Sequence, residues 1–175
     1  VQIAGTHGPD QPILWAGGGS SAFDRSKHDV IGGFEALYEP CYVEDLSLSW
    51  QAWRRGWRCV YAHDSVVHHA HRGTSNKVFS REALERLNWR NRELFFLRSV
   101  TDPLLLLTHA TMLTWNIRKH SRLLGIPMAH GVLAILASIP RLPQAIWQRT
   151  CSRRHYRRSD RALLQQVEVS PPTAP

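Results

Sequence analysis

The sequence predicts an α/β fold followed by a helical extension. Up to Ser75, short apolar runs alternate with Gly-rich turns and amphipathic helical stretches, an order typical of one edge of an α/β sheet. Beyond Ser75, apolar residues recur at helical spacing and no further strand pattern follows. We therefore expect a partial α/β domain over residues 1–75, a helical, membrane-associating extension over residues 76–148, and a basic, disordered tail over residues 149–175.

The first elements are two short strands around a glycine loop. A strand is expected at Ile13–Ala16, running into the loop Gly17–Ser21 (Gly-Gly-Gly-Ser-Ser), and a second at residues 22–23. Three consecutive glycines allow backbone angles and close approaches that side chains forbid. A short helix should begin near Ser26 and end at Gly32–Gly33.

The central element is a helix that begins at two adjacent carboxylates, Glu44 and Asp45. The apolar residues that follow are spaced by four, three and four positions, which is one face of an α-helix; they are Leu46, Trp50, Trp53 and Trp57. Carboxylates in a first helical turn match the free N–H groups and the helix dipole, and this alone could explain the pair. Strands at Arg58–Ala62 and at residues 65–69 should follow.

Two long helical regions are expected after Ser75. Ser80 should cap a helix over Arg81–Val100, and Asp102, followed by proline, should cap the next. Two strongly apolar stretches, Leu104–Trp115 and Leu123–Ile139, are flanked by basic residues. This pattern is typical of helices on an anionic membrane surface, although a Leu-rich helical core would show it too.

The charge of the chain indicates the kind of partner, and its cysteines indicate the redox setting. The net charge is +8, and six arginines fall between Arg149 and Arg161 against the single carboxylate of Asp160. An anionic partner is expected, but only Tyr156 interrupts the arginines and no nucleic-acid-binding motif accompanies them, so we predict no nucleic acid. The three cysteines are an odd number without Cys-x-x-Cys spacing, which favours a reduced, intracellular setting.

A histidine cluster offers a metal-binding alternative. The sequence has histidines at four nearby positions, which are His63, His68, His69 and His71. His68 and His69 would point to opposite faces of a strand, whereas His69 and His71 could share one metal ion. No paired cysteines or His-x₃-His spacing accompany them, so a structural zinc site is the weaker reading.

The ordered motifs up to Ser75 resemble a known enzyme family. They are the glycine–serine loop, the Ile31–Phe34 turn (Ile-Gly-Gly-Phe), the Glu44-Asp45 pair, the Arg-Arg-Gly-Trp turn at 54–57, and a strand ending in histidines before Gly73-Thr74-Ser75. In this order they are similar to the second half of the family 2 glycosyltransferases of the GT-A fold. The resemblance covers about Pro12 to Ser75 and implies the acceptor-side part of a GT-A mixed sheet.

The resemblance implies roles for particular residues. Asp45 would be the general base that deprotonates an acceptor hydroxyl for inverting attack on the anomeric carbon of a nucleotide sugar. His69 would help to hold a divalent cation, Mn²⁺ or Mg²⁺, at the donor diphosphate once the missing N-terminal half is present. The implied substrate-binding residues are Trp15, Gly17, Gly18, Gly19 and Glu44.

The sequence also departs from the family pattern. The chain begins at Val1 without Met or a signal segment, and it contains no Asp-x-Asp pair for the metal. We therefore expect a fragment that lacks the nucleotide-binding half and is inactive alone. Ser47 stands where an acid is often found two positions after the Glu-Asp pair. Residues 51–55 lack the tryptophan of the Gln-x-x-Arg-Trp signature, which favours a non-processive enzyme.

The helical extension is similar to those of bacterial rhamnosyltransferase-like enzymes of surface-polysaccharide synthesis. That similarity implies a lipid-linked saccharide acceptor and a location at the cytoplasmic face of the cell membrane. The alternative is a non-catalytic membrane-associated protein that keeps half of a degenerate transferase fold. A longer reading frame upstream carrying Asp-x-Asp, or its absence, would separate the two.

Overall fold

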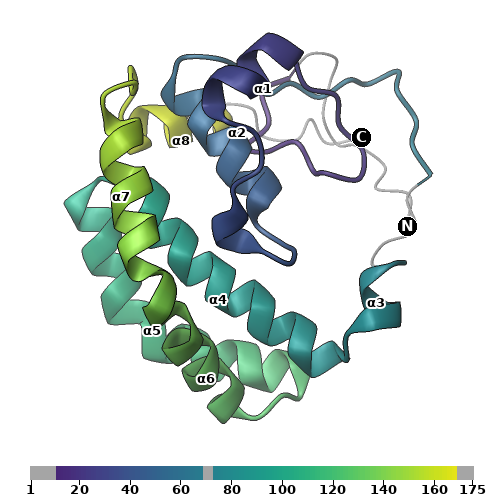
Figure 1. The fold of residues 1–175 in the computed structure, drawn as a ribbon, viewed down its shortest axis with the longest axis vertical. Helices are drawn as coiled ribbons and strands as arrows, with labels where there is room; N and C mark the ends of the chain where they lie inside the picture. The colour runs from purple at the N-terminus through teal and green to yellow at the C-terminus, as the bar shows by residue number, and fades with distance from the viewer. Residues whose placement is uncertain (1–10, 69–72, 169–175) are drawn as a thin grey trace. The chain divides into compact units, whose positions relative to one another are not determined.

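The computed structural model describes residues 11–68 and 73–168 of the chain. Its elements are the helices α1 (Arg25–Ile31), α2 (Glu44–Arg54), α3 (Ser75–Val78), α4 (Arg81–Ser99), α5 (Pro103–Leu124), α6 (Met128–Ser138), α7 (Leu142–Arg153) and α8 (Asp160–Glu168), with 3₁₀ turns η1 (Ala36–Tyr38) and η2 (Ile139–Arg141) (Figure 1).

The predicted α/β class, with its GT-A mixed sheet, is wrong for this chain. The structure is about 65% helical, and its described residues form no sheet. Ile13 of the expected first strand does meet Cys59 of the expected third, with its N–H donating to the Cys59 carbonyl at 3.0 Å, and an isolated bridge joins the preceding Pro12 to Val60. Two extended segments with no third strand beside them rarely form a stable sheet in water.

The chain forms two compact units. The first, called the α2 unit, comprises the described residues of Val1–Glu35, Glu44–Gly73 and His155–Pro175. The second, called the helical unit, comprises Ala36–Val43 and Thr74–Arg154. The predicted boundaries at residues 75 and 148 differ from this division, because residues 36–43 join the later helices and the described C-terminal segment joins α2.

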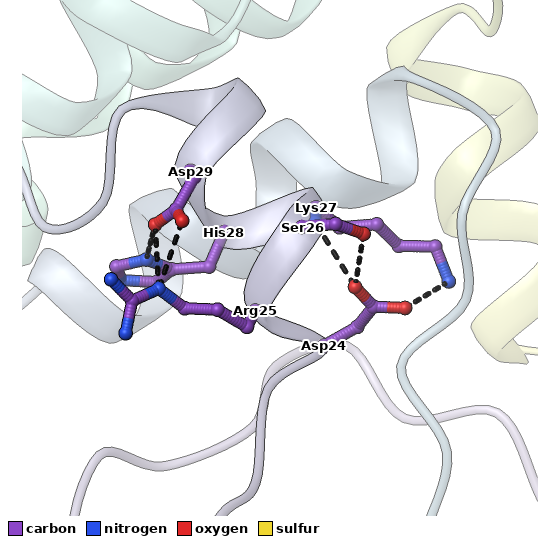
Figure 2. Close-up of polar contacts among 6 residues, drawn as sticks. All are labelled: Asp24, Arg25, Ser26, Lys27, His28 and Asp29. Carbon is purple, nitrogen blue, oxygen red and sulfur yellow. Dashed lines mark hydrogen bonds and ion pairs between the residues drawn. The ribbon is translucent and has the colours of Figure 1, made fainter.

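Local capping signals set several helix ends. Ser80 caps α4 by accepting the Ala83 N–H, and Asp102 caps α5 with proline at its first position, both as the sequence predicts. Helix α1, predicted to begin near Ser26, begins at Arg25 and is capped by Asp24. The Asp24 carboxylate accepts the Ser26 hydroxyl at 2.6 Å and the Lys27 N–H at 3.1 Å, and both contacts are drawn in Figure 2.

The helical unit is built around α4, which packs against α6 and α7 and spans the unit (Figure 1). Its core includes Trp89, Ile117 and Ala134, from three successive long helices. Two acid–histidine pairs also join α4 to α5. Glu93 Oε2 lies 2.7 Å from His109 Nε2, and Glu85 Oε2 lies 3.5 Å from His120 Nε2.

Asn91 of α4 fixes the short segment that precedes α2. Its side-chain amide nitrogen lies 2.6–2.9 Å from three backbone carbonyls, those of Tyr38, Cys41 and Tyr42. The Asn91 side chain is fully buried, so these bonds replace the water that its amide loses. This anchoring explains why residues 36–43 belong to the helical unit.

The expected disordered tail is folded over residues 149–168. The last turns of α7 and all of α8 lie in this range. The arginines there also make structural contacts: Arg149 donates to the Leu97 carbonyl at 2.8 Å, and Arg158 donates to the Gln166 side chain at 2.6 Å. The prediction of a basic, disordered tail did not include these contacts.

The longest apolar stretch of the sequence is divided between two helices. Gly125, with φ +66°, ends α5, and Leu123–Ile139 continues through a short turn into α6. Among the described residues, no helix combines the length and the apolar character that crossing a bilayer requires.

Candidate functional site

One side of α2 holds the extended N-terminal segment of the α2 unit. Asp45, Ser49 and Trp53 are spaced by four residues and therefore follow one stripe of the helix. Each makes one hydrogen bond to the backbone of residues 13–18, which runs antiparallel to α2. The bonds are Trp53 Nε1–H to the Ile13 carbonyl (3.0 Å), Ala16 N–H to Ser49 Oγ (3.1 Å) and Gly18 N–H to Asp45 Oδ2 (3.0 Å).

This arrangement brings the glycine loop to the predicted base. Gly17 accepts the Ser20 N–H at 3.1 Å, which closes a tight turn. At the turn Gly18 presents its N–H to Asp45, 27 positions later in the sequence. A Cβ on Gly18 would lie 3.7 Å from the Asp45 Cβ, an ordinary contact, so glycine is not required there by space alone.

The Asp45 carboxylate is held by two hydrogen bonds but remains open to solvent. Its Oδ2 accepts from Gly18, and its Oδ1 accepts the Leu46 N–H at 2.7 Å. The Asp45 side chain is partly exposed and Gly18 is exposed, so solvent or a ligand can reach this turn. A carboxylate has about four lone-pair positions, which leaves Asp45 able to accept a proton from a bound hydroxyl.

Glu44 differs from its neighbour in its surroundings. It is half-buried, and burial raises the pKa of its carboxyl, with the nearby charge of Asp45 acting in the same direction. Its Oε2 is buried with no hydrogen-bond partner among the described residues. The adjacent pair therefore offers one accessible carboxylate and one whose charged form is disfavoured.

A third carboxylate, Glu35, was missed by sequence analysis. The Ser47 hydroxyl donates to Glu35 Oε2 at 2.7 Å. A carboxylate thus reaches the first turns of α2 from another segment, although position 47 itself is a serine. The available signal was the place of Glu35 directly after the Ile31–Phe34 turn.

That Gly-Gly-Phe turn is shaped by packing. Gly32 and Gly33 both have positive φ, and a Cβ on Gly33 would come within 2.9 Å of the His28 ring. The His28 ring also contacts Phe34 edge-on, with centroids 5.8 Å apart. The two glycines therefore have a structural reason to be there, whether or not a ligand approaches.

The far end of α2 is fixed by the segment before and within α8. Arg54 forms a 2.7 Å ion pair with Asp160, and both side chains are buried. The Arg54 carbonyl accepts the Arg157 N–H at 2.7 Å, and the Gln51 amide donates to the Tyr156 hydroxyl at 3.0 Å. Because Asp45 lies on the same rigid helix, these contacts help to fix its position.

The other predicted site residues are not joined to this site by any described contact. Trp15 is half-exposed, and Gly19 is exposed at the loop. The predicted metal ligand His69, and the His69–His71 pair, lie outside the described residues. Within residues 11–68 and 73–168, no three His, Cys, Asp or Glu side chains are grouped so that they could hold a metal ion.

The helical unit contains a separate polar cluster. A small cavity there is lined by Glu85, Trp89, His120, Ser121 and His130, among others. Burial lowers the pKa of His120, with Arg92 acting in the same direction and Glu85 opposing both. His130 Nδ1 is buried with no hydrogen-bond partner in the described structure. The cavity thus brings two histidines and one carboxylate together within the packing of the helical unit.

Comparison with known proteins does not assign this chain to a family. Comparison of the chain with protein-family models, with curated proteins and with solved structures found no match.

Proposed function

We propose that this chain is the acceptor-side part of an inverting, non-processive glycosyltransferase. The reaction would move a sugar from a nucleotide-sugar donor to a hydroxyl of a lipid-linked or polysaccharide acceptor. The observation that supports this is the 3.0 Å hydrogen bond from Gly18 N–H to Asp45 Oδ2. It joins two motifs of the glycosyltransferase resemblance in one accessible turn.

In this proposal Asp45 is the general base. Its carboxylate takes the proton of the acceptor hydroxyl while the hydroxyl oxygen attacks the anomeric carbon, and the nucleoside diphosphate leaves from the opposite face. The Gly18 N–H keeps the carboxylate in place. Since burial disfavours a charge on Glu44, that residue is suited to hold a hydroxyl by hydrogen bonding.

The described residues do not form a metal site, so no step of the proposal depends on a metal held by them. The nucleotide-binding part would come from sequence beyond this chain, and His69, which lies outside the described residues, would share with it any Mn²⁺ or Mg²⁺ at the donor diphosphate. The isolated 175 residues should therefore show no tight binding of nucleotide sugars in calorimetry. Micromolar binding with turnover would contradict the fragment proposal.

The test of the base is Asp45→Asn in a polypeptide that also supplies the donor-binding part. The asparagine Oδ1 can still accept the Gly18 N–H, but the side chain can no longer take a proton. Sugar transfer should fall by about 10²–10⁴-fold, the usual worth of a general base, with donor affinity nearly unchanged.

Glu44→Gln is the matched control, because it changes the adjacent carboxylate in the same way. A larger loss in Glu44→Gln than in Asp45→Asn would move the base to Glu44. Full transfer activity in both variants would exclude this carboxylate pair. If the longer polypeptide transferred no sugar with any donor tried, the non-catalytic alternative would replace the proposal.

A further inference from the structure

The excess positive charge of the protein lies in one unit. The helical unit contains thirteen Lys and Arg residues against five Asp and Glu residues, a net charge of +8. The remaining sequence contains nine of each, a net charge of zero. An anionic partner is therefore expected for the helical unit rather than for the α2 unit.

Helix α5 carries an exposed stripe that changes character along its length. Leu104, Leu107 and Trp115 lie on it at 55%, 60% and 61% exposure. One turn after Trp115 the same stripe becomes basic, and its exposed cations are Arg118, Lys119 and Arg122. These positions fall at i, i+3, i+11, i+14, i+15 and i+18, so they lie within one face of the helix. The opposite face packs into the core through Ile117.

Further apolar side chains are exposed on the next two helices of the same unit. They are Met128, Val132, Leu133 and Leu136 of α6, and Ile146 and Trp147 of α7. Soluble surfaces usually carry such residues singly rather than on three consecutive helices. Exposed tryptophan beside arginine and lysine is typical of helices at the boundary between lipid headgroups and acyl chains.

We propose that the helical unit binds the surface of an anionic phospholipid leaflet through the α5 stripe. Leucines and Trp115 enter the boundary region, while the three cations at the end of α5 meet lipid phosphates. A second copy of the chain fits less well, because it would place one +8 unit against another. The proposal does not depend on the activity proposed for Asp45.

The test is co-sedimentation of the whole chain with phosphatidylcholine vesicles, with and without phosphatidylglycerol. Binding should require phosphatidylglycerol at low salt and should weaken, without vanishing, as salt is added. A surface cation contributes about a factor of five, so the triple variant Arg118→Gln, Lys119→Gln, Arg122→Gln should bind on the order of 10²-fold more weakly. Equal binding by this variant and the wild type would overturn the proposal.

A charge-matched control uses three cations of the α2 unit. The variant Arg25→Gln, Lys27→Gln, Arg58→Gln changes the net charge equally and should keep nearly wild-type vesicle binding. The variant Leu104→Gln, Leu107→Gln should lose the salt-resistant part of binding while keeping the dependence on phosphatidylglycerol. Circular dichroism should show unchanged helix content in all variants, since every changed side chain is at least partly exposed.

Two further readouts separate a leaflet from other occupants. Tryptophan emission should shift to the blue on vesicle binding in the wild type and shift less in Trp115→Phe. Light scattering without vesicles should report a monomer. A dimer that Leu104→Gln, Leu107→Gln dissociates, together with no vesicle binding, would show that a second copy covers the stripe and that the proposal is wrong.

Discussion

At the scale of single residues, two groups of the same type can have very different surroundings. Glu44 and Asp45 are adjacent in sequence, yet only Glu44 has a buried oxygen without a partner. Likewise His120 is packed against Trp89, with ring centroids 5.0 Å apart, whereas His155 is exposed. Burial raises the pKa of Glu44 in the α2 unit and lowers the pKa of His120 in the helical unit, which gives the two units opposite pH dependences.

The α2 unit should lose stability as the pH rises past the ordinary glutamate range. Because the pKa of Glu44 is raised in the folded protein, the unfolded chain gives up this proton first. The favourable contribution is complete below pH 4.5 and is lost as the pH rises through the folded pKa. Glu44→Gln should flatten this part of a urea-denaturation series across pH. An unchanged profile would contradict the assigned shift.

The helical unit should instead lose stability as the pH falls. The pKa of His120 is lowered in the folded protein, so the unfolded chain binds a proton more readily as the pH falls below 6.5. Replacing His120 with Gln should reduce the acid sensitivity of the α4–α6 helices in hydrogen exchange. His155→Gln is the control, because this exposed histidine lies outside the cluster and should leave the profile unchanged.

At the scale of elements, packing between helices depends on glycine at one crossing. A Cβ on Gly131 of α6 would come within 2.9 Å of Ile117 Cγ2 in the core of the helical unit. Gly131→Ala should therefore destabilise this unit by about 1–3 kcal/mol, the usual cost of overpacking. Gly17→Ala is the comparison, since nothing lies within 4 Å of the added methyl group. Equal denaturant midpoints would show that the α5–α6 crossing adjusts freely.

The attachment of α8 to α2 should depend on its buried ion pair. Asp160→Ala leaves the Arg54 guanidinium buried without this partner and should cost about 3–5 kcal/mol in urea denaturation. The double variant Arg54→Met, Asp160→Leu removes both charges and should recover much of that loss. A small effect of Asp160→Ala, below about 1 kcal/mol, would mean that water or another side chain replaces the carboxylate.

The elements predicted correctly are those whose signals are local. Ser80, Asp102 and the two carboxylates at the start of α2 act within one helical turn, so their positions can be read from adjacent residues. The strand predictions were wrong because a strand needs partners elsewhere in the chain. Ile13 pairs with Cys59 through its N–H only, and its carbonyl accepts the Trp53 Nε1–H, a contact that apolar patterning cannot reveal.

At the scale of the whole molecule, the net positive charge and the candidate site lie in different units. The proposed reaction centre lies in the neutral unit, and the net charge of +8 lies in the helical unit. Sequence composition gives the total charge but not this division, because the α2 unit is assembled from three separate segments. The arginines after residue 154 count toward the neutral unit only once the return of the chain to α2 is known.

Salt should therefore stabilise the two units unequally. Like charges in the helical unit repel one another, and added salt screens that repulsion with a Debye length of about 8 Å at physiological ionic strength. In hydrogen-exchange mass spectrometry of the whole chain, salt should slow exchange in α5–α7 more than in α2. The same change in both units, or a larger one in α2, would contradict this expectation.

The Arg54–Asp160 pair spans 106 positions of sequence, which matters for the order of events during synthesis. The helices from α4 to α7 are consecutive, so their contacts can form as the nascent chain emerges from the ribosome. The α2 unit must instead wait until the codon for Asp160 has been translated. A premature stop or a frameshift between the codons for residues 154 and 160 would thus disable a turn encoded more than a hundred codons earlier, while leaving the helical unit free to fold.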